Sequence, residues 1–129
     1  MNVVDLSAWL EFFADGPNAG EFASAIEDAD SLIVPTISLF EVFKRIRVQR
    51  DADSALEAIA FMQRGRPVDL DADLAIEAAD LSVELKLPLA DSIILATARR
   101  HEAVLWTQDS DFEGIPGVES RRPRGRRRS

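Results

Sequence analysis

The chain of 129 residues has no cysteine and a single histidine, His101. The lack of cysteine excludes disulfide bonds, thiol catalysis and thiolate metal sites, and it fits a reducing compartment. No apolar run approaches the length of a membrane span, and the N-terminus lacks the basic and then apolar pattern of an export signal. We therefore expect a cytoplasmic protein that does not enter the membrane.

Basic residues are scarce outside the last nine positions. Six of the fifteen lysines and arginines are arginines within residues 121–129. The rest of the chain has nine basic and twenty-three acidic residues, which gives it a formal net charge of −14. Such an acidic body binds nucleic acids poorly by itself, because neutralising phosphates requires Lys and Arg. A role on nucleic acid would need bound cations or local basic patches. We expect the tail, 121–129, to be disordered.

The remaining residues, 1–120, have enough apolar content for one domain with a core. Continuous apolar segments predict short buried strands, which we place at residues 2–5, 31–34, 68–70 and 103–107, with a weak fifth strand near Val118. Helical patterns lie between them, at residues 8–14, 18–28, 36–50, 54–63, 71–85 and 88–100. This alternation predicts an α/β fold of three layers, α/β/α, around a mostly parallel sheet of four to five strands.

Acidic residues stand where such a fold brings them to one edge. Asp5 ends the first strand, Glu41 lies early in the helix after the second, and Asp91 lies in the first turn of the last long helix. Asp109 and Asp111 follow the fourth strand. In open parallel sheets the ligand crevice lies outside the carboxyl ends of the strands. We therefore expect these carboxylates to lie close together.

Each acid also has an ordinary interpretation by itself. Ser38 and Glu41 match a helix capping box, Asp91 could complement a helix dipole, and Asp109 with Asp111 could form a simple turn. As a group they favour divalent-metal catalysis, because Mg²⁺ and Mn²⁺ prefer hard oxygen ligands and position water against a phosphodiester.

Four ordered motifs carry a family resemblance. VVDLSAWLEFF, the helical Glu41, LADSIILATA and TQDSDF resemble PIN-domain ribonucleases, specifically the VapC-type toxins of bacterial toxin–antitoxin pairs, up to about Glu119. The resemblance implies a PIN-like nuclease domain and an endoribonuclease that needs Mg²⁺ (or Mn²⁺) to hydrolyse RNA phosphodiester bonds. The implied catalytic acids are Asp5, Glu41, Asp91 and Asp109. The implied metal ligands are Asp5, Asp91, Asp109 and Asp111, and which of the last two is the closer one stays open.

Two hydroxyl residues match positions at which the family often has a hydroxyl near the metal. These are Ser7 and Thr107, and a helix N-cap for Ser7 and a strand-end hydroxyl for Thr107 remain as alternatives. Leu6 departs from the family, which often has a small hydroxyl residue there.

The resemblance also implies partners. The RNA substrate would be tRNA or rRNA, a VapB-like antitoxin would wrap the toxin, and the first helices would form a homodimer. The densest basic region before the tail is our candidate for RNA binding, with a solvated helix face as the alternative; it comprises Lys44, Arg45, Arg47 and Arg50. Phe12, Phe13, Phe40 and Phe43 are interpreted as core or dimer contacts rather than platforms for bases.

Three other interpretations of the sequence are possible. A PIN-like domain could bind RNA or protein without cutting, although a retained set of carboxylates argues against it. A receiver-type signalling domain has a similar sheet but requires a lysine at the end of a late strand, which AVLWTQD lacks. Residues 69–73 imitate a calcium loop but lack its glycine and closing glutamate, so we interpret Asp71 as a helix cap.

Overall fold

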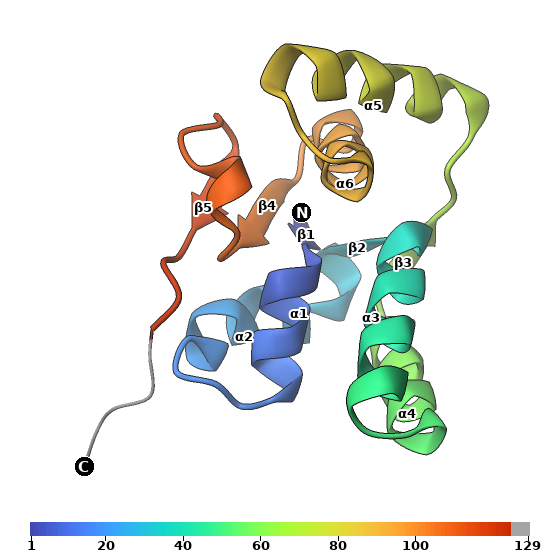
Figure 1. Cartoon of the computed structure of the whole chain (residues 1–129), viewed down its shortest axis with the longest axis vertical. Coiled ribbons are helices and arrows are strands. Elements are labelled where there is room, and N and C mark those ends of the chain that lie inside the picture. The colour runs from blue at the N-terminus through green and yellow to red at the C-terminus, as the bar shows by residue number, and fades with distance from the viewer. Residues whose placement is uncertain (125–129) are drawn as a thin grey trace.

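The computed structural model describes residues 1–124, which form five strands and six α-helices around one sheet (Figure 1). The strands are β1 (Asn2–Val4), β2 (Leu32–Pro35), β3 (Arg66–Val68), β4 (Val104–Thr107) and β5 (Val118–Ser120). All pairs are parallel, in the order β3-β2-β1-β4-β5. All carboxyl ends therefore lie at the same edge, and β1 is the central strand.

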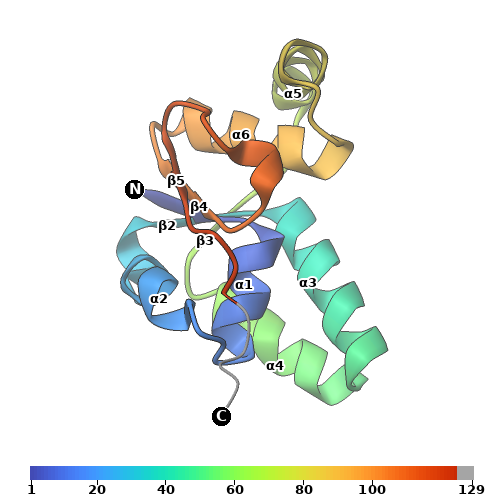
Figure 2. The ribbon, with the colours of Figure 1, turned by 60° about the vertical axis from the view of Figure 1, so that its left-hand side comes forward.

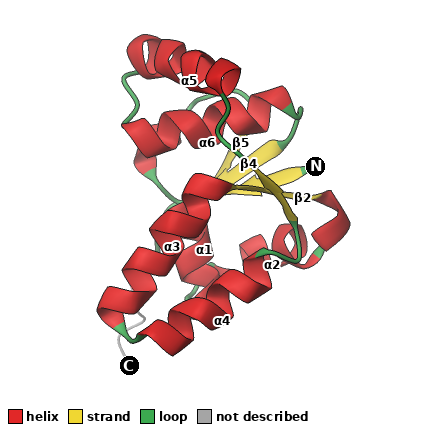
Figure 3. Cartoon of the chain, turned by 90° about the vertical axis from the view of Figure 1, so that its right-hand side faces the viewer, coloured by secondary structure: helices red, strands yellow, loops and turns green. Residues whose placement is uncertain are grey.

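The helices cover both faces of the sheet (Figure 3). On one face lie α1 (Leu6–Phe13), α2 (Ala19–Glu27), α3 (Thr36–Gln49) and α4 (Ala52–Met62). On the other lie α5 (Ala72–Leu85) and α6 (Leu89–Arg100), and short 3₁₀ turns occupy Ala29–Ser31 and Ser110–Phe112. The predicted three-layer fold with a parallel sheet is confirmed.

Alternating side chains of the buried strands build two cores. Val4 and Val34 face α1 to α4, where they join a cluster that contains Trp9 and Phe22. Their neighbours Val3 and Ile33 face α6, where they join a second cluster with Leu105 and Phe112. Successive residues of a strand point to opposite faces, so an unbroken apolar run is required to fill both cores.

The edge strand β3 departs from the prediction. It occupies Arg66–Val68 rather than residues 68–70, and Arg66 and Pro67 are exposed. As the outermost strand it pairs only with β2, so it tolerates a proline and lacks the buried pattern by which strands are recognised. Nearby, α4 begins two residues earlier than predicted, because the side chain of Asp51 caps it by accepting from the Ser54 amide.

Asp71 caps α5 as predicted, since its carboxylate accepts from the Leu74 amide at 2.8 Å. No helix within residues 1–124 has the length and apolar character needed to cross a membrane.

The part of the tail that the structure describes lies against the body. Arg121 pairs with Glu21 and Glu119, and Arg124 also pairs with Glu21 on α2. Figure 2 shows this segment leaving β5 on the side of α1 and α2. Residues 125–129, which make up most of the predicted disordered tail, lie outside the described residues.

Candidate active site

Asp5 occupies the junction between the central strand and α1. Only 2% of the residue is exposed, and its Oδ1 accepts from the Ala8 amide at 3.1 Å, so Asp5 is the N-cap of α1. Ser7 donates to Oδ1 at 2.7 Å, and Thr107 donates to Oδ2 at 2.7 Å. The interpretation of Ser7 as the N-cap is therefore wrong, and both hydroxyls instead contact this carboxylate.

The same hydroxyls fix the chain that follows β4. The backbone amide of Gln108 donates to Ser7 Oγ at 3.0 Å, and that of Asp109 donates to Thr107 Oγ1 at 2.9 Å. The ends of β1 and β4, neighbours in the sheet, are thus linked by side chains as well as by the strand pairing. A carboxylate has roughly four acceptor positions, and Asp5 uses three of them within the protein.

Three further carboxylates meet at this edge. Asp91 comes from the first turn of α6, while Asp109 and Asp111 come from the loop after β4. Each offers an oxygen, and these oxygens all lie within 4.8 Å of one another. Asp109 Oδ1 also accepts from the Asp111 amide at 2.9 Å, which holds the loop in a tight turn. Asp91, Asp109 and Asp111 are called the acidic trio below.

The pKa values reflect the crowding of negative charge. Burial raises the pKa of Asp91 to about 7, assisted by the charges of Asp109, Asp5, Asp111 and Glu41. Burial raises the pKa of Asp5 to about 6, although the bonds from Thr107, Ser7 and Ala8 oppose that rise. The ion pairs formed among residues 1–124 involve none of these acids. The site therefore holds negative charge that no ion pair among the described residues neutralises.

Glu41 lies beside the acidic trio but outside it. Its Oε1 is buried without a hydrogen-bond partner, and its pKa is raised by burial and by the charge of Asp5, which Arg45 partly offsets. The N-cap of α3 is Pro35, which leaves no capping role for Ser38 or Glu41. The capping-box interpretation is therefore wrong, and Glu41 has no local structural bond to explain its burial.

These residues fit a hard divalent cation. The acidic trio supplies anionic oxygens at mutual distances that one ion can span, and the unpartnered Glu41 oxygen and the raised pKa of Asp91 both indicate missing positive charge. Asp5, with three of its acceptor positions filled, is better held than the others and has the least freedom to move toward a ligand.

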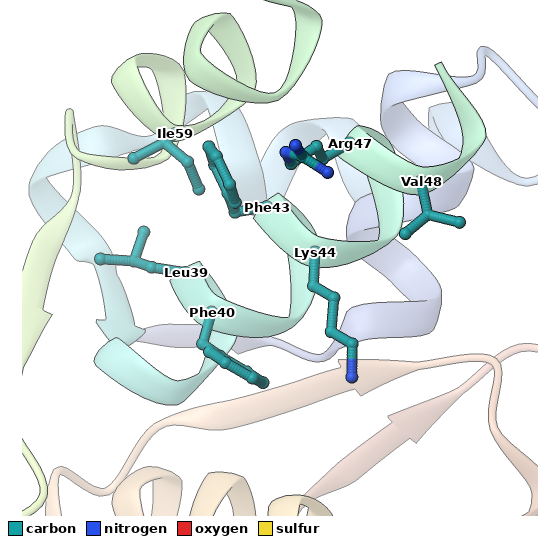
Figure 4. Close-up of a pocket in the computed structure, with 7 residues that line it drawn as sticks. All are labelled: Leu39, Phe40, Phe43, Lys44, Arg47, Val48 and Ile59. Carbon is teal, nitrogen blue, oxygen red and sulfur yellow. The ribbon is translucent and has the colours of Figure 1, made fainter. Parts of the chain in front are cut away.

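The four predicted RNA-binding residues, three on α3 and Arg50 at its C-cap, are all exposed and line three different hollows. Lys44 and Arg45 line a hollow that also contains Glu41. Lys44 and Arg47 border an apolar groove of about 620 Å³. Figure 4 shows that Phe40 and Lys44 point to one side of α3 and Phe43 to another. Arg50 lines a separate groove between α1 and α4. Only Lys44 and Arg45 border the acidic edge.

Two polar residues near the site, Asn18 and Gln108, were not predicted from the sequence. Asn18 is 1% exposed and bonds to the side chain of Gln108, a link between residues ninety positions apart that leaves no local signal. Phe40 is 64% exposed, which leaves a dimer contact as the prediction for this residue, whereas Phe12 and Phe13 pack against Phe61.

Comparison with solved structures finds the same fold in bacterial toxins. A toxin–antitoxin complex from Klebsiella pneumoniae aligns with a TM-score of 0.78 and 26% identity, over 93% of this chain and 97% of that one. VapC20 of Mycobacterium tuberculosis, a sarcin–ricin loop cleaving toxin, aligns with a TM-score of 0.77 and 20% identity, over 95% and 100%. DNA-bound VapBC from Salmonella typhimurium aligns with a TM-score of 0.72 and 19% identity, over 92% of this chain and 96% of that one. No curated protein matches the chain.

A family model for the PIN domain matches residues 3–118. The match begins in β1, ends in β5 and includes every acid of the site. The alternative of a receiver-type domain is therefore wrong. The chain belongs to the PIN domain family.

Proposed function

We propose that this protein is a divalent-metal-dependent endoribonuclease and the toxin of a VapBC-type pair. The observation that carries the proposal is the acidic trio, whose oxygens lie within 4.8 Å of one another at the carboxyl edge of the sheet. Family membership and the likeness to toxin structures support it. Phosphodiester hydrolysis requires neutralised phosphate charge, which this anionic edge can supply only through a bound cation.

The roles of the acids follow from their surroundings. Asp91, Asp109 and Asp111 would hold Mg²⁺ or Mn²⁺, which neutralises phosphate charge and makes water a better nucleophile. Asp5 is fixed by Ser7 and Thr107 and orients the loop that carries Asp109. Glu41 Oε1, buried and without a partner, is suited to accept a proton, because the raised pKa of this carboxyl makes it a better base.

RNA would reach the site over the middle of α3, where Lys44 and Arg45 lie. Lys44 and Arg45 share a hollow with Glu41, which makes them the basic residues best suited to hold phosphates beside the acids. Arg47 would extend this basic surface, while Arg50, in another groove, would contribute least. A VapB-like antitoxin would neutralise the activity, and we expect a cytoplasmic homodimer.

Cleavage of structured RNA such as tRNA or rRNA tests the proposal. We expect the purified chain to cut such RNA with Mg²⁺ or Mn²⁺ and to lose this activity in excess EDTA. Asp5→Asn, prepared in parallel, should be inactive because Asp5 lies among the acids, whereas Asp73→Asn should be fully active because Asp73 is an exposed residue of α5. Undiminished cleavage in EDTA contradicts the proposal. RNA binding without cleavage under all conditions would favour the non-catalytic alternative.

A further inference from the structure

Asn18 precedes α2 but does not act as its cap. Asparagine is among the preferred N-cap residues, because its side chain can accept from the first free amides of a helix. Asn18 stands at the N-cap of α2, yet its side chain makes no capping bond. It is 1% exposed, so its amide group is buried and must find partners elsewhere. The buried side chain of Asn18 therefore has a role other than capping α2.

The partners of Asn18 lie far away in the chain. Its Nδ2 donates to Gln108 Oε1 at 2.9 Å and to the Arg122 carbonyl at 3.0 Å. Gln108 lies between Thr107, which contacts Asp5, and Asp109, a member of the acidic trio. The side chain of Asn18 thus joins the loop after β4 to the chain after β5.

The turn that presents Asn18 is itself rigid. The Asn18 amide donates to Glu11 Oε2 at 2.7 Å, and the Gly16 amide donates to the Glu11 carbonyl at 3.0 Å. A Cβ at Gly16 would lie 2.2 Å from Glu11 Oε1, so the glycine lets this carboxylate fold over the turn. The Asn18 side chain can hold the loop after β4 only if its own position is fixed. Glu11 and Gly16 fix the turn that carries Asn18.

Side chains, rather than bonds between backbone groups, hold the beginning of the loop that follows β4. At its far end Phe112 is fully buried and anchors the turn. At the near end the backbone amides of Gln108 and Asp109 bond to Ser7 and Thr107, and the Gln108 side chain is held by Asn18. We propose that Asn18 is a positioning residue, which acts through Gln108 to hold Asp109 and Asp111 in the geometry that binds the metal.

This inference deepens the proposed function, because it concerns the same metal site. The test compares Asn18→Ser with wild type in two measurements, hydrogen exchange of residues 107–112 without metal and Mn²⁺ affinity without RNA. Serine keeps a good N-cap but is too short to reach Gln108. We expect faster exchange in the loop and an affinity for Mn²⁺ about tenfold weaker, as found when groups that orient metal ligands are removed.

A double-mutant cycle tests whether the effect passes through Gln108. Gln108→Leu removes the same bond from the other side, so the double variant should bind Mn²⁺ no more weakly than Asn18→Ser. Losses that multiply would overturn the inference, because the two residues would then act independently.

Asp51→Ala is the matched control. It removes a true N-cap, that of α4, and lowers stability without touching the loop. If Asp51→Ala loosens residues 107–112 as much as Asn18→Ser does, or if Asn18→Ser leaves exchange unchanged, Asn18 is merely structural and the inference is wrong. Faster exchange in Asn18→Ser with no Mn²⁺ binding even in wild type would show that Asn18 orders the loop, but it would contradict the metal site and with it the proposed nuclease.

Discussion

Two helices on the same side of the sheet carry an aspartate at or near their N-terminus, and the two carboxylates behave in opposite ways. Asp71 caps α5 and pairs with Arg100, and the bonds from Leu74 and Arg100 lower its pKa. Asp91 lies in the first turn of α6 among other acids, and burial with their charges raises its pKa to about 7. Position in a helix is therefore a poor guide to role, since the difference comes from what the fold places opposite each carboxylate.

The largest expected effect is the loss of RNA cleavage when Asp91, but not Asp71, is substituted. Asp91→Asn should reduce RNA cleavage by at least about a hundredfold, since it removes a proposed metal ligand. It should nevertheless leave the metal-free protein as stable as wild type or more stable, because it removes a repelled charge. Asp71→Asn should do the reverse, lowering the melting temperature while cleavage is retained.

Cleavage assays and thermal melts in EDTA and in Mg²⁺ decide this comparison. Mg²⁺ should raise the melting temperature of wild type, because the ion binds only the native state, and should have little effect on Asp91→Asn. If metal-free Asp91→Asn melts well below metal-free wild type, Asp91 is a structural residue like Asp71.

The second prediction concerns Arg45, one of the two basic residues that border the acidic edge. Arg45 lowers the pKa of Glu41, as Arg100 does for Asp71, but Arg45 is exposed and free of ion pairs to the described residues. Reversing the charges of Arg45 and Arg47 together should weaken RNA binding and reduce the slope of log affinity against log salt by about 1.4, or about 0.7 for each lost phosphate contact. Reversal at Arg50 is the matched control. A slope unchanged by the double reversal would remove this part of α3 from the RNA path.

The smallest expected effect is on stability against pH. Asp91 has a pKa of about 7 when folded and near 3.8 when unfolded, so between these values the folded state binds the extra proton. Unfolding then releases protons, and the metal-free protein should become less stable as the pH rises from about 5 to about 8. Asp91→Asn should flatten that dependence, and Asp71→Asn should not. Melting temperatures in EDTA across this range measure it, and equal slopes in wild type and Asp91→Asn would contradict the raised pKa.

The sequence predicted what depends on continuous or periodic apolar residues. The central strands, the helices and the gathering of acids at one edge follow from segments such as VVD and LADSII, because burial on two faces leaves a local pattern. The edge strand β3 was misplaced because it is exposed and has one neighbour. The bonds of Asp5 to Thr107 and of Asn18 to Gln108 join distant residues, and no local pattern records such contacts.

The central position of β1 has a consequence for synthesis. The residues that pair β1 with β2 are complete at residue 35, but the other neighbour of β1, β4, begins only at residue 104. At elongation rates of roughly 5 to 20 residues per second this interval lasts about 3.5 to 14 s, during which one edge of the strand stays open. Asp5 lacks its hydrogen bond from Thr107 until β4 has been made, and Asp91 lacks its neighbours Asp109 and Asp111. A growing chain on the ribosome therefore carries an incomplete site, and the proposed metal-binding geometry arises only when nearly the whole domain has emerged.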